Sequence, residues 1–364
     1  MRHFTVCGLL ACFALTAFAG GIRIERGELD GAAFALARPA QWNGRVLLLA
    51  HGFRPEDRPL VADLSIEHAA YRRLLDAGWI VAKTSYRRNG VIIRDAIADL
   101  DALREYIAQT SGAPERVILE GDSMGGLIVT LIAESGDPHY SGAVAVGAAL
   151  SVREPGKPFT LSGRPRLPLL FLTNRSELAE PRAYVESDAA RPEVHAQPAL
   201  FVVQRDGHVN VNQRERLTAL RALIGWIDHG RDSLPPPAPG AAFYEATAKP
   251  DAMPSRVTPS ENGRGFTTSV LETSAVYGNV LLAAQPGDFA VAGIAPRTWF
   301  RLLAGKRSFR VFYGQGFSSV RRGEWVAFPN ADGWVWLGRN FGDAAASAQL
   351  GEGDRVTLQA FTPE

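Results

Sequence analysis

The sequence is poor in cysteine, and its two cysteines, Cys7 and Cys12, lie close to the N-terminus. The rest of the chain can therefore form no disulfide, no cysteine nucleophile and no thiolate metal site. Long apolar runs are also lacking after residue 19, where none approaches the roughly 20 residues of a membrane span. We expect hydrophobic cores alone to hold this protein together.

An excess of charge of either sign is lacking as well, because 39 Lys and Arg residues balance 38 Asp and Glu residues, for a net charge of +1. Such a balance provides no electrostatic footprint for nucleic acid. The sequence has no P-loop, no His-Glu-x-x-His motif and no dinucleotide fingerprint, so we expect no cofactor. With 364 residues, of which 46% are hydrophobic, the chain has the composition and length of two globular domains. The oligomeric state is left open.

The N-terminus has the pattern of a secretory signal peptide. A short basic start, Met1-Arg2-His3, precedes an apolar run from Val6 to Ala19 that ends in Ala17-Phe18-Ala19, a small-x-small cleavage site. We expect residues 1–19 to be removed and the protein to be periplasmic or secreted. The alternative is a lipoprotein signal cut before Cys12, but this would shorten the apolar segment to about five residues, below the usual range.

Segments typical of strands and helices alternate over residues 22–232. Alternation of this kind predicts an α/β domain with a mainly parallel sheet and helices on both faces. Two short alternating runs flank Asp30-Gly31, which predicts a hairpin. Strands are expected at 23–29, 32–37, 45–50, 79–84, 116–119, 143–149, 168–172 and 199–203, and helices at 67–75, 92–107, 126–134 and 215–227.

The composition changes after this domain. Residues 233–265 are rich in proline, which is typical of a semi-rigid linker. Short runs with strand character then follow, punctuated by Gly, Asp and Asn, and predict a small all-β, barrel-like domain over residues 266–364. Its strands are expected at 267–273, 279–284, 310–313, 324–328, 333–337 and 355–360.

One motif in the first domain carries nucleophilic chemistry. Gly121-Asp122-Ser123-Met124-Gly125 is a Gly-x-Ser-x-Gly sequence between an expected strand and an expected helix. This is the context of a nucleophile elbow, which exposes the serine Oγ at the carboxyl end of a sheet. The adjoining helix N-terminus adds partial positive charge where an oxyanion would form.

A serine nucleophile needs a base and an acid that orients the base. His208 follows the last expected strand of the sheet, the position that the base occupies in this arrangement. Glu177 follows the preceding strand and is our candidate acid. Glu180 and Asp188 are alternatives.

An oxyanion hole requires two backbone N–H donors. Met124, which follows the serine, provides one. Phe53, after the strand at 45–50 in His51-Gly52-Phe53, is the expected second donor. His51 is expected to be structural rather than the base.

Residues 22–232 resemble bacterial α/β-hydrolases of the serine esterase type in four stretches, "WNGRVLLLAHGF", "SYRRNG", "GDSMGG" and "DGHVNVN", which occur in the expected order. The resemblance implies an acyl-enzyme on Ser123 and a catalytic His208. Such families usually have an aspartate where this chain has Glu177. Residues 151–167 show no helix pair, so we expect no large lid and no long-chain lipid substrate.

The C-terminal segment is similar to the C-terminal β-domain of the S-adenosylmethionine hydroxide adenosyltransferase family. The matching stretches are "YGNV", "GEWVAF", "GRNFGDAA" and "LGEGDRV". The resemblance places Arg339 and Asn340 in the nucleoside-contacting segment, whereas Ser274 replaces an aspartate of the family. Four tryptophans are expected to serve core packing rather than a stacking platform: Trp299, Trp325, Trp334 and Trp336.

The sequence thus predicts an exported serine hydrolase that cleaves carboxylic esters and has a small-molecule substrate as its partner. Two other functions remain open. A serine peptidase could use the same triad, because it also acts on amides. A non-catalytic protein could bind a nucleoside or a glycan through the β-domain.

Overall fold

The computed structural model describes residues 14–19, 21–156, 159–189, 196–251 and 254–361. The chain divides into two compact units. The first consists of Met1–Thr173, Leu178–Phe201 and Ala219–Tyr244. The second consists of Asn174–Glu177, Val202–Thr218 and Glu245–Glu364. The domain boundaries expected from the sequence stay a prediction, and the second unit includes two short segments of the expected hydrolase region.

Strands between residues 14 and 245 form a ten-stranded sheet with the strand order β1-β2-β3-β5-β4-β6-β7-β8-β9-β10. Strands β5, β4, β6, β7 and β8 pair in parallel, whereas β1, β2, β3 and β5 pair as antiparallel neighbours. The mainly parallel sheet expected from the sequence is confirmed. The strands are β1 Ala14–Ala19, β2 Ile22–Leu29, β3 Ala32–Arg38, β4 Arg45–Ala50, β5 Ile80–Thr84, β6 Arg116–Asp122, β7 Gly142–Val146, β8 Leu169–Asn174, β9 Ala199–Val203 and β10 Tyr244–Glu245.

The local sequence explains these strands. The hairpin between β2 and β3 turns at Asp30 and Gly31, whose φ angles of 50° and 86° suit the turn types that match strand twist. The central strands are continuous apolar runs because both of their faces are covered. In β7 and β9 every residue is buried.

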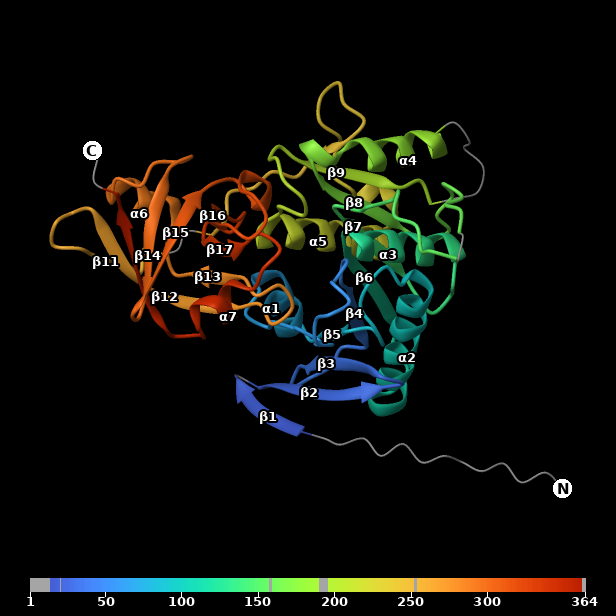
Figure 1. Ribbon diagram of the computed structural model, residues 1–364. Helices are drawn as coiled ribbons and strands as arrows, with labels where there is room; N and C mark the ends of the chain where they lie inside the picture. The colour runs from blue at the N-terminus through green and yellow to red at the C-terminus, as the bar shows by residue number, and fades with distance from the viewer. Residues whose placement is uncertain (1–13, 20, 157–158, 190–195, 252–253, 362–364) are drawn as a thin grey trace. The chain divides into compact units, whose positions relative to one another are not determined.

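Helices cover both faces of the sheet (Figure 1). Helices α2 and α3 lie on one side of it, and α1 and the C-terminal part of α5 lie on the other. The helices are α1 Ala69–Asp76, α2 Ile93–Ser111, α3 Met124–Ser135, α4 Ala179–Ala189 and α5 Gln213–His229.

Helix α4 is not among the helices expected from the sequence. Its segment has few apolar residues, and Pro181 lies in its first turn, where proline is tolerated. Only Pro181 and Tyr184 are buried among the side chains described in this helix. Two inward residues do not produce a periodic pattern that could have been detected.

Strands between residues 265 and 360 form a closed β-barrel of seven strands in the order β12-β13-β17-β16-β15-β14-β18, closed by β12 with β18. All neighbours are antiparallel except β15 and β16. A short strand, β11 Thr258–Pro259, adds to β12. The barrel strands are β12 Gly265–Thr273, β13 Val280–Leu282, β14 Trp299–Ala304, β15 Arg307–Tyr313, β16 Trp325–Pro329, β17 Val335–Arg339 and β18 Arg355–Ala360, and the short helices are α6 Pro286–Val291 and α7 Ala344–Ala348.

The barrel has its own hydrophobic core. Phe289 of α6 packs against Phe266, Phe300 and Tyr313, with ring centroids 5.3, 5.6 and 4.6 Å away. The all-β domain expected from the sequence is confirmed. Strand β14 was not among its expected strands, because Leu302 and Leu303 interrupt the alternation that marks a strand.

Candidate active site

Ser123 lies at a sharp turn between β6 and α3. Its φ of 57° and ψ of −116° are unusual for a residue with a side chain. The Ser123 N–H donates to the Val146 carbonyl at 2.9 Å, and its carbonyl accepts from the Ala149 N–H at 3.1 Å. Strand β7 and the loop after it therefore hold the strained backbone. The half-buried side chain sits at the N-terminus of α3.

The turn depends on glycine because backbones approach closely on each side of Ser123. A Cβ on Gly121 would lie 2.1 Å from the Gly125 carbonyl oxygen. A Cβ on Gly125 would lie 2.0 Å from the Ala50 carbonyl oxygen at the end of β4. Neither distance is possible between non-bonded atoms, so the two glycines of the motif are required by packing.

The loop after β4 runs beside Ser123. A Cβ on Gly52 would lie 3.0 Å from the Ser123 Cβ and 3.7 Å from its Oγ. Phe53 is the next residue, and its side chain is 48% exposed. Met124, the first residue of α3, is buried. The two backbone segments expected to supply oxyanion donors thus flank Ser123 within the first unit.

His51 is buried and held by backbone carbonyls. Its Nδ1 lies 2.7 Å from the Gly52 oxygen and its Nε2 lies 2.9 Å from the Ser85 oxygen. Burial, with a further contribution from the nearby Arg54 guanidinium, lowers the pKa of His51 to about 3. The ring of Tyr86 lies 3.9 Å away, centroid to centroid. A neutral imidazole carries a single N–H, so it donates to one of these two carbonyls at a time, and the buried ring packs beneath the loop of residues 51–53 as a structural group rather than as the base.

His208 and Glu177 form a hydrogen-bonded pair in the second unit. The His208 Nδ1 lies 2.6 Å from the Glu177 Oε2. The other carboxylate oxygen accepts from the Val209 N–H at 3.1 Å. Because one carboxylate contacts both the imidazole and the adjacent backbone, the orientation of the ring is fixed.

The alternative acids have other surroundings. Glu180 accepts a hydrogen bond from the Ser151 N–H at 3.0 Å within the first unit. The backbone of Asp188 belongs to α4, and its side chain lies outside the described residues. Of the three candidates, Glu177 is therefore the one for which the structure records a bond to His208.

The loops that contain Glu177 and His208 are joined by further contacts. The Asn174 amide nitrogen donates to the Asn210 carbonyl at 2.8 Å, and the Asn210 N–H donates back to the Asn174 Oδ1 at 2.8 Å. The Gly207 N–H donates to Ser176 Oγ at 2.9 Å. Asn174 is fully buried. The reciprocal amide pair therefore holds the two loops in one arrangement, because breaking it would leave buried polar atoms without hydrogen-bond partners.

Ser123 belongs to the first unit, and the His208–Glu177 pair belongs to the second. The contacts that hold Ser123 lie within the first unit, and those that hold the His208–Glu177 pair lie within the second. The proton-sharing contact between Ser123 and His208 stays a prediction.

A cavity of about 480 Å³ opens in the first unit beyond the loop that follows β7. Leu150 and Ser151 are among the residues that line it, as is Tyr184 of α4. Ala149, which bonds to the Ser123 carbonyl, directly precedes Leu150. The lining of the cavity thus begins at the residue next to Ala149, and this cavity is the candidate substrate pocket.

The barrel residues that the sequence associated with a nucleoside have structural contacts. The Arg339 guanidinium donates to the Gly323 carbonyl at 3.0 Å and to Ser347 Oγ at 3.1 Å. The Asn340 side chain donates to the Val320 carbonyl at 2.9 Å. Both side chains hold loops of the barrel together, so these contacts do not support the nucleoside-contacting role that the resemblance implied.

The four barrel tryptophans do not share one surface platform. Trp325 is buried, with its ring centroid 4.5 Å from that of Phe309. The Trp299 ring lies under the Arg310 guanidinium at 4.3 Å. Trp334 is buried, and Trp336 is half-buried. Packing is the role that these environments indicate.

Among the described residues, no group of three or more His, Cys, Asp or Glu side chains could hold a metal ion. The helices in the described part of the chain are too short or too polar to cross a membrane.

Comparisons with known proteins agree with this architecture. Residues 88–252 match the family described as serine aminopeptidase, S33. Residues 276–357 match the family described as SAM hydroxide adenosyltransferase C-terminal domain. The first match includes Ser123, Glu177 and His208, and it supports a serine hydrolase as the class of protein. No curated protein matches the chain.

Several solved structures match parts of the chain. A putative dienelactone hydrolase from Klebsiella pneumoniae is 17% identical over 61% of this chain and 100% of its own, with a TM-score of 0.43. Est1E from Butyrivibrio proteoclasticus is 14% identical over 57% of this chain and 96% of its own, with a TM-score of 0.36. An uncharacterized conserved protein from Thermotoga maritima is 22% identical over 30% of this chain, with a TM-score of 0.27, and the chain spans only 41% of its length.

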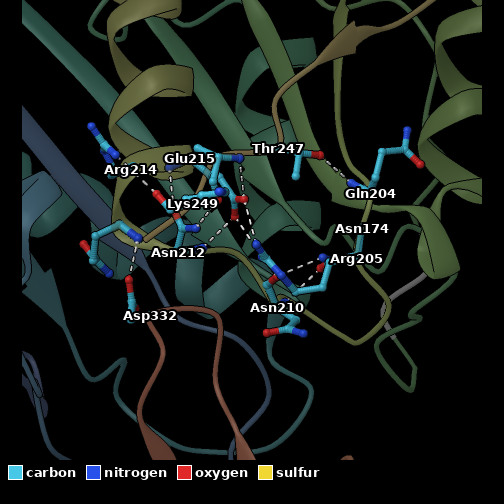
Figure 2. Close-up of polar contacts among 12 residues, drawn as sticks. Asn174, Gln204, Arg205, Asn210, Asn212, Arg214, Glu215, Thr247, Lys249 and Asp332 are labelled. Carbon is cyan, nitrogen blue, oxygen red and sulfur yellow. Dashed lines mark hydrogen bonds and ion pairs between the residues drawn. The ribbon is translucent and has the colours of Figure 1, made fainter. Parts of the chain in front are cut away.

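Sequence reasoning missed the residues that support His208. Asn212 and Glu215 have the Asn-x-x-Glu spacing of a capping box, which could have been recognised before the helix at 215–227. The Asn174–Asn210 pair has no such signal, because its partners are 36 residues apart. Figure 2 shows both sets of contacts.

Proposed function

We propose that this protein is a serine hydrolase that cleaves carboxylic esters through an acyl-enzyme on Ser123. The supporting observation is the backbone of Ser123, which is strained at φ 57° and held at the start of α3 by close packing of Gly121 and Gly125. Such strain persists only where the surroundings enforce it, and it commonly marks a functional residue.

The proposed reaction begins when Ser123 Oγ attacks the ester carbonyl carbon. His208 takes the hydroxyl proton through Nε2, because its Nδ1 is bonded to Glu177. The C–O bond to the alcohol then breaks, and His208 returns the proton to the leaving alkoxide. Water attacks the acyl-enzyme in a second round with the same proton transfers, which releases the acid and restores Ser123.

The negative charge on the tetrahedral oxygen needs donors that are already in place. We assign the backbone N–H groups of Phe53 and Met124 to this role. Gly52 brings the first segment next to Ser123, and Met124 opens helix α3. Two such donors, with the positive end of a helix dipole behind one of them, stabilise the transition state more than the neutral ester.

Replacement of the nucleophile tests the proposal. Ser123→Ala should abolish hydrolysis of p-nitrophenyl acetate and butyrate and abolish labelling by a fluorophosphonate, because the proposed acyl-enzyme forms on the Ser123 hydroxyl. Circular dichroism and the thermal midpoint should show an intact fold. Ser308→Ala, which removes an exposed serine from strand β15 of the barrel, is the matched control for the loss of a hydroxyl. Hydrolysis that survives in Ser123→Ala would refute the assignment.

Amide hydrolysis is the second candidate, because the family matched by residues 88–252 is described as a serine aminopeptidase. The same acyl-enzyme chemistry applies, with an amine as the leaving group. A panel of aminoacyl p-nitroanilides beside the p-nitrophenyl esters separates the two. A higher kcat/KM on the anilides would replace the ester proposal. A fluorophosphonate-inert wild type would instead favour the non-catalytic nucleoside- or glycan-binding protein.

We also propose that the chain is exported and cut after Ala19. Most of the expected signal, including Cys7 and Cys12, lies outside the described residues, whereas Ala14–Ala19 forms β1 and pairs with β2. Removal of residues 1–19 would make β2 the edge of the sheet. N-terminal sequencing of the exported protein should start at Gly20, whereas a lipid-modified start at Cys12 would establish the lipoprotein alternative.

A further inference from the structure

The loop that contains His208 leads directly into helix α5, and the start of that helix is fixed by a capping box. The Glu215 N–H donates to Asn212 Oδ1 at 2.9 Å, and the Asn212 N–H donates to Glu215 Oε2 at 2.8 Å. These bonds satisfy backbone donors that would otherwise have no partner at a helix N-terminus. The position of the first turn of α5 therefore sets where the histidine loop ends.

Glu215 also links this cap to other parts of the second unit (Figure 2). Its side chain is fully buried and receives two bonds of 3.0 Å from the Arg205 guanidinium. It also accepts from the Ala248 N–H at 3.0 Å. Arg205 donates in turn to the Asn210 carbonyl at 2.9 Å, within the histidine loop. One buried carboxylate thus connects the base of the loop to the segment that leads to the barrel.

Asp332 of the barrel reaches the same helix end. It lies in the turn between β16 and β17, and its Oδ1 accepts from the Gln213 N–H at 2.8 Å. Gln213 is the first residue of α5, so its N–H has no partner within the helix. A carboxylate at this end also interacts favourably with the helix dipole.

We propose that Asp332 is a positioning residue for His208, through which the barrel fixes the first turn of α5 and thereby the histidine loop. The inference rests on the proposed hydrolase function. Residues 209–212 are all that separate His208 from α5. Any shift of the helix end is therefore passed on to the imidazole, and a displacement of about 1 Å at a catalytic group can cost roughly 100-fold in rate.

Burial around Asp332 supports a specific role for this carboxyl. Burial raises its pKa, whereas the Gln213 N–H bond and the charges of Arg216 and Arg205 oppose that rise and Glu215 reinforces it. A carboxylate that is partly desolvated is costly unless it is hydrogen-bonded. The bond from the Gln213 N–H therefore offsets the cost of partly burying the Asp332 carboxylate in the barrel turn.

The test uses the full-length chain with Asp332→Ala and Asp332→Asn. We expect Asp332→Ala to lower kcat for p-nitrophenyl butyrate by roughly 10- to 100-fold. KM should change little, because substrate binding does not involve this residue. Asp332→Asn should recover most of the loss, because an amide oxygen can still accept from the Gln213 N–H.

Asp354→Ala is the matched control. Asp354 also lies in a barrel turn and accepts from a backbone N–H, that of Gly351 at 2.8 Å, but the structure records no bond between its side chain and α5. This variant should keep the kcat of the wild type. An equal loss of kcat in both alanine variants would overturn the proposal in favour of a general effect of barrel stability, and an unchanged kcat in Asp332→Ala would also overturn it.

Two further measurements keep the outcome interpretable. If Asp332→Ala does not fold, Asp332→Glu moves the carboxylate by one methylene, and we expect its kcat to fall below that of Asp332→Asn. Equal values in these two variants would contradict the proposal. A wild-type chain that hydrolyses neither esters nor anilides would instead refute the proposed function and not this inference alone.

Discussion

Replacing Glu177, the proposed acid of the triad, should affect the imidazole of His208 directly. A neutral glutamine keeps the size of the side chain but cannot stabilise the imidazolium, and it favours the wrong tautomer of His208. We expect Glu177→Gln to lower kcat for a p-nitrophenyl ester by about 10³- to 10⁴-fold. Steady-state kinetics with active-site titration by a fluorophosphonate measure this loss.

Glu180→Gln is the control for that experiment. Its carboxylate accepts from the Ser151 N–H rather than from the imidazole. Its kcat should therefore stay near that of the wild type, and any effect should fall on KM, because Glu180 also lines the candidate substrate pocket. A loss confined to Glu180→Gln, with Glu177→Gln fully active, would transfer the acid to Glu180.

At the scale of single residues, sequence reasoning found the groups whose signals are local. Ser123 has glycines on both sides in a fixed motif, and His208 follows a strand in a glycine turn. Glu177 was chosen for its place after a strand, and the structure puts it 2.6 Å from His208. Asp332 gave no signal, because its partner Gln213 is 119 residues away. A bond between such distant positions depends on the fold and not on a pattern in the chain.

At the scale of whole elements, helix α3 packs closely against the end of strand β4 at Gly125. Gly125→Ala would place a Cβ 2.0 Å from the Ala50 carbonyl oxygen, and two backbones would have to move apart. We expect it to lower the free energy of unfolding by more than about 3 kcal/mol. Urea denaturation followed by circular dichroism measures the change.

Gly287→Ala is the matched control for this substitution. Gly287 lies in helix α6, and a Cβ there would meet no atom within 4 Å. Alanine also has the better helix propensity, so this variant should be neutral or stabilised by up to about 1 kcal/mol. Comparable destabilisation in both variants would argue against the close contact of α3 with β4.

Elements with a strong period or a continuous apolar run were predicted well. Strands β4, β9 and β18 have the bounds expected from the sequence. Helix α4 and strand β14 were missed because the first buries few side chains and the second has two adjacent leucines. In both, tertiary contacts stabilise a segment whose own pattern is ambiguous.

For the molecule as a whole, His51 predicts a characteristic response to acid. Its pKa is about 3 in the folded chain and 6.5 when exposed, so the unfolded chain binds the extra proton first as the pH falls. Its contribution is fully present above pH 6.5 and is lost progressively below it. Between pH 6.5 and pH 5 this group alone should lower the free energy of unfolding by about 2 kcal/mol.

Urea unfolding at pH 7 and pH 5 tests this response in the wild type and in His51→Gln. The variant should lose less stability between the two pH values, whatever its stability at pH 7. His139→Gln is the control, because the His139 side chain is 61% exposed. Equal losses in the wild type and His51→Gln would show that the buried imidazole does not govern the acid response.

The parallel pair β15–β16 has a consequence for how the barrel closes. In a closed ring of strands, direction must return to its starting sense after one circuit, so the number of antiparallel steps must be even. Seven strands give seven steps, and this parity is met only because β15 and β16 run the same way. Residues 314–324 must therefore traverse the barrel from one rim to the other before β16 can begin. Replacing them with a two-residue reverse turn would leave an odd count and an open ring.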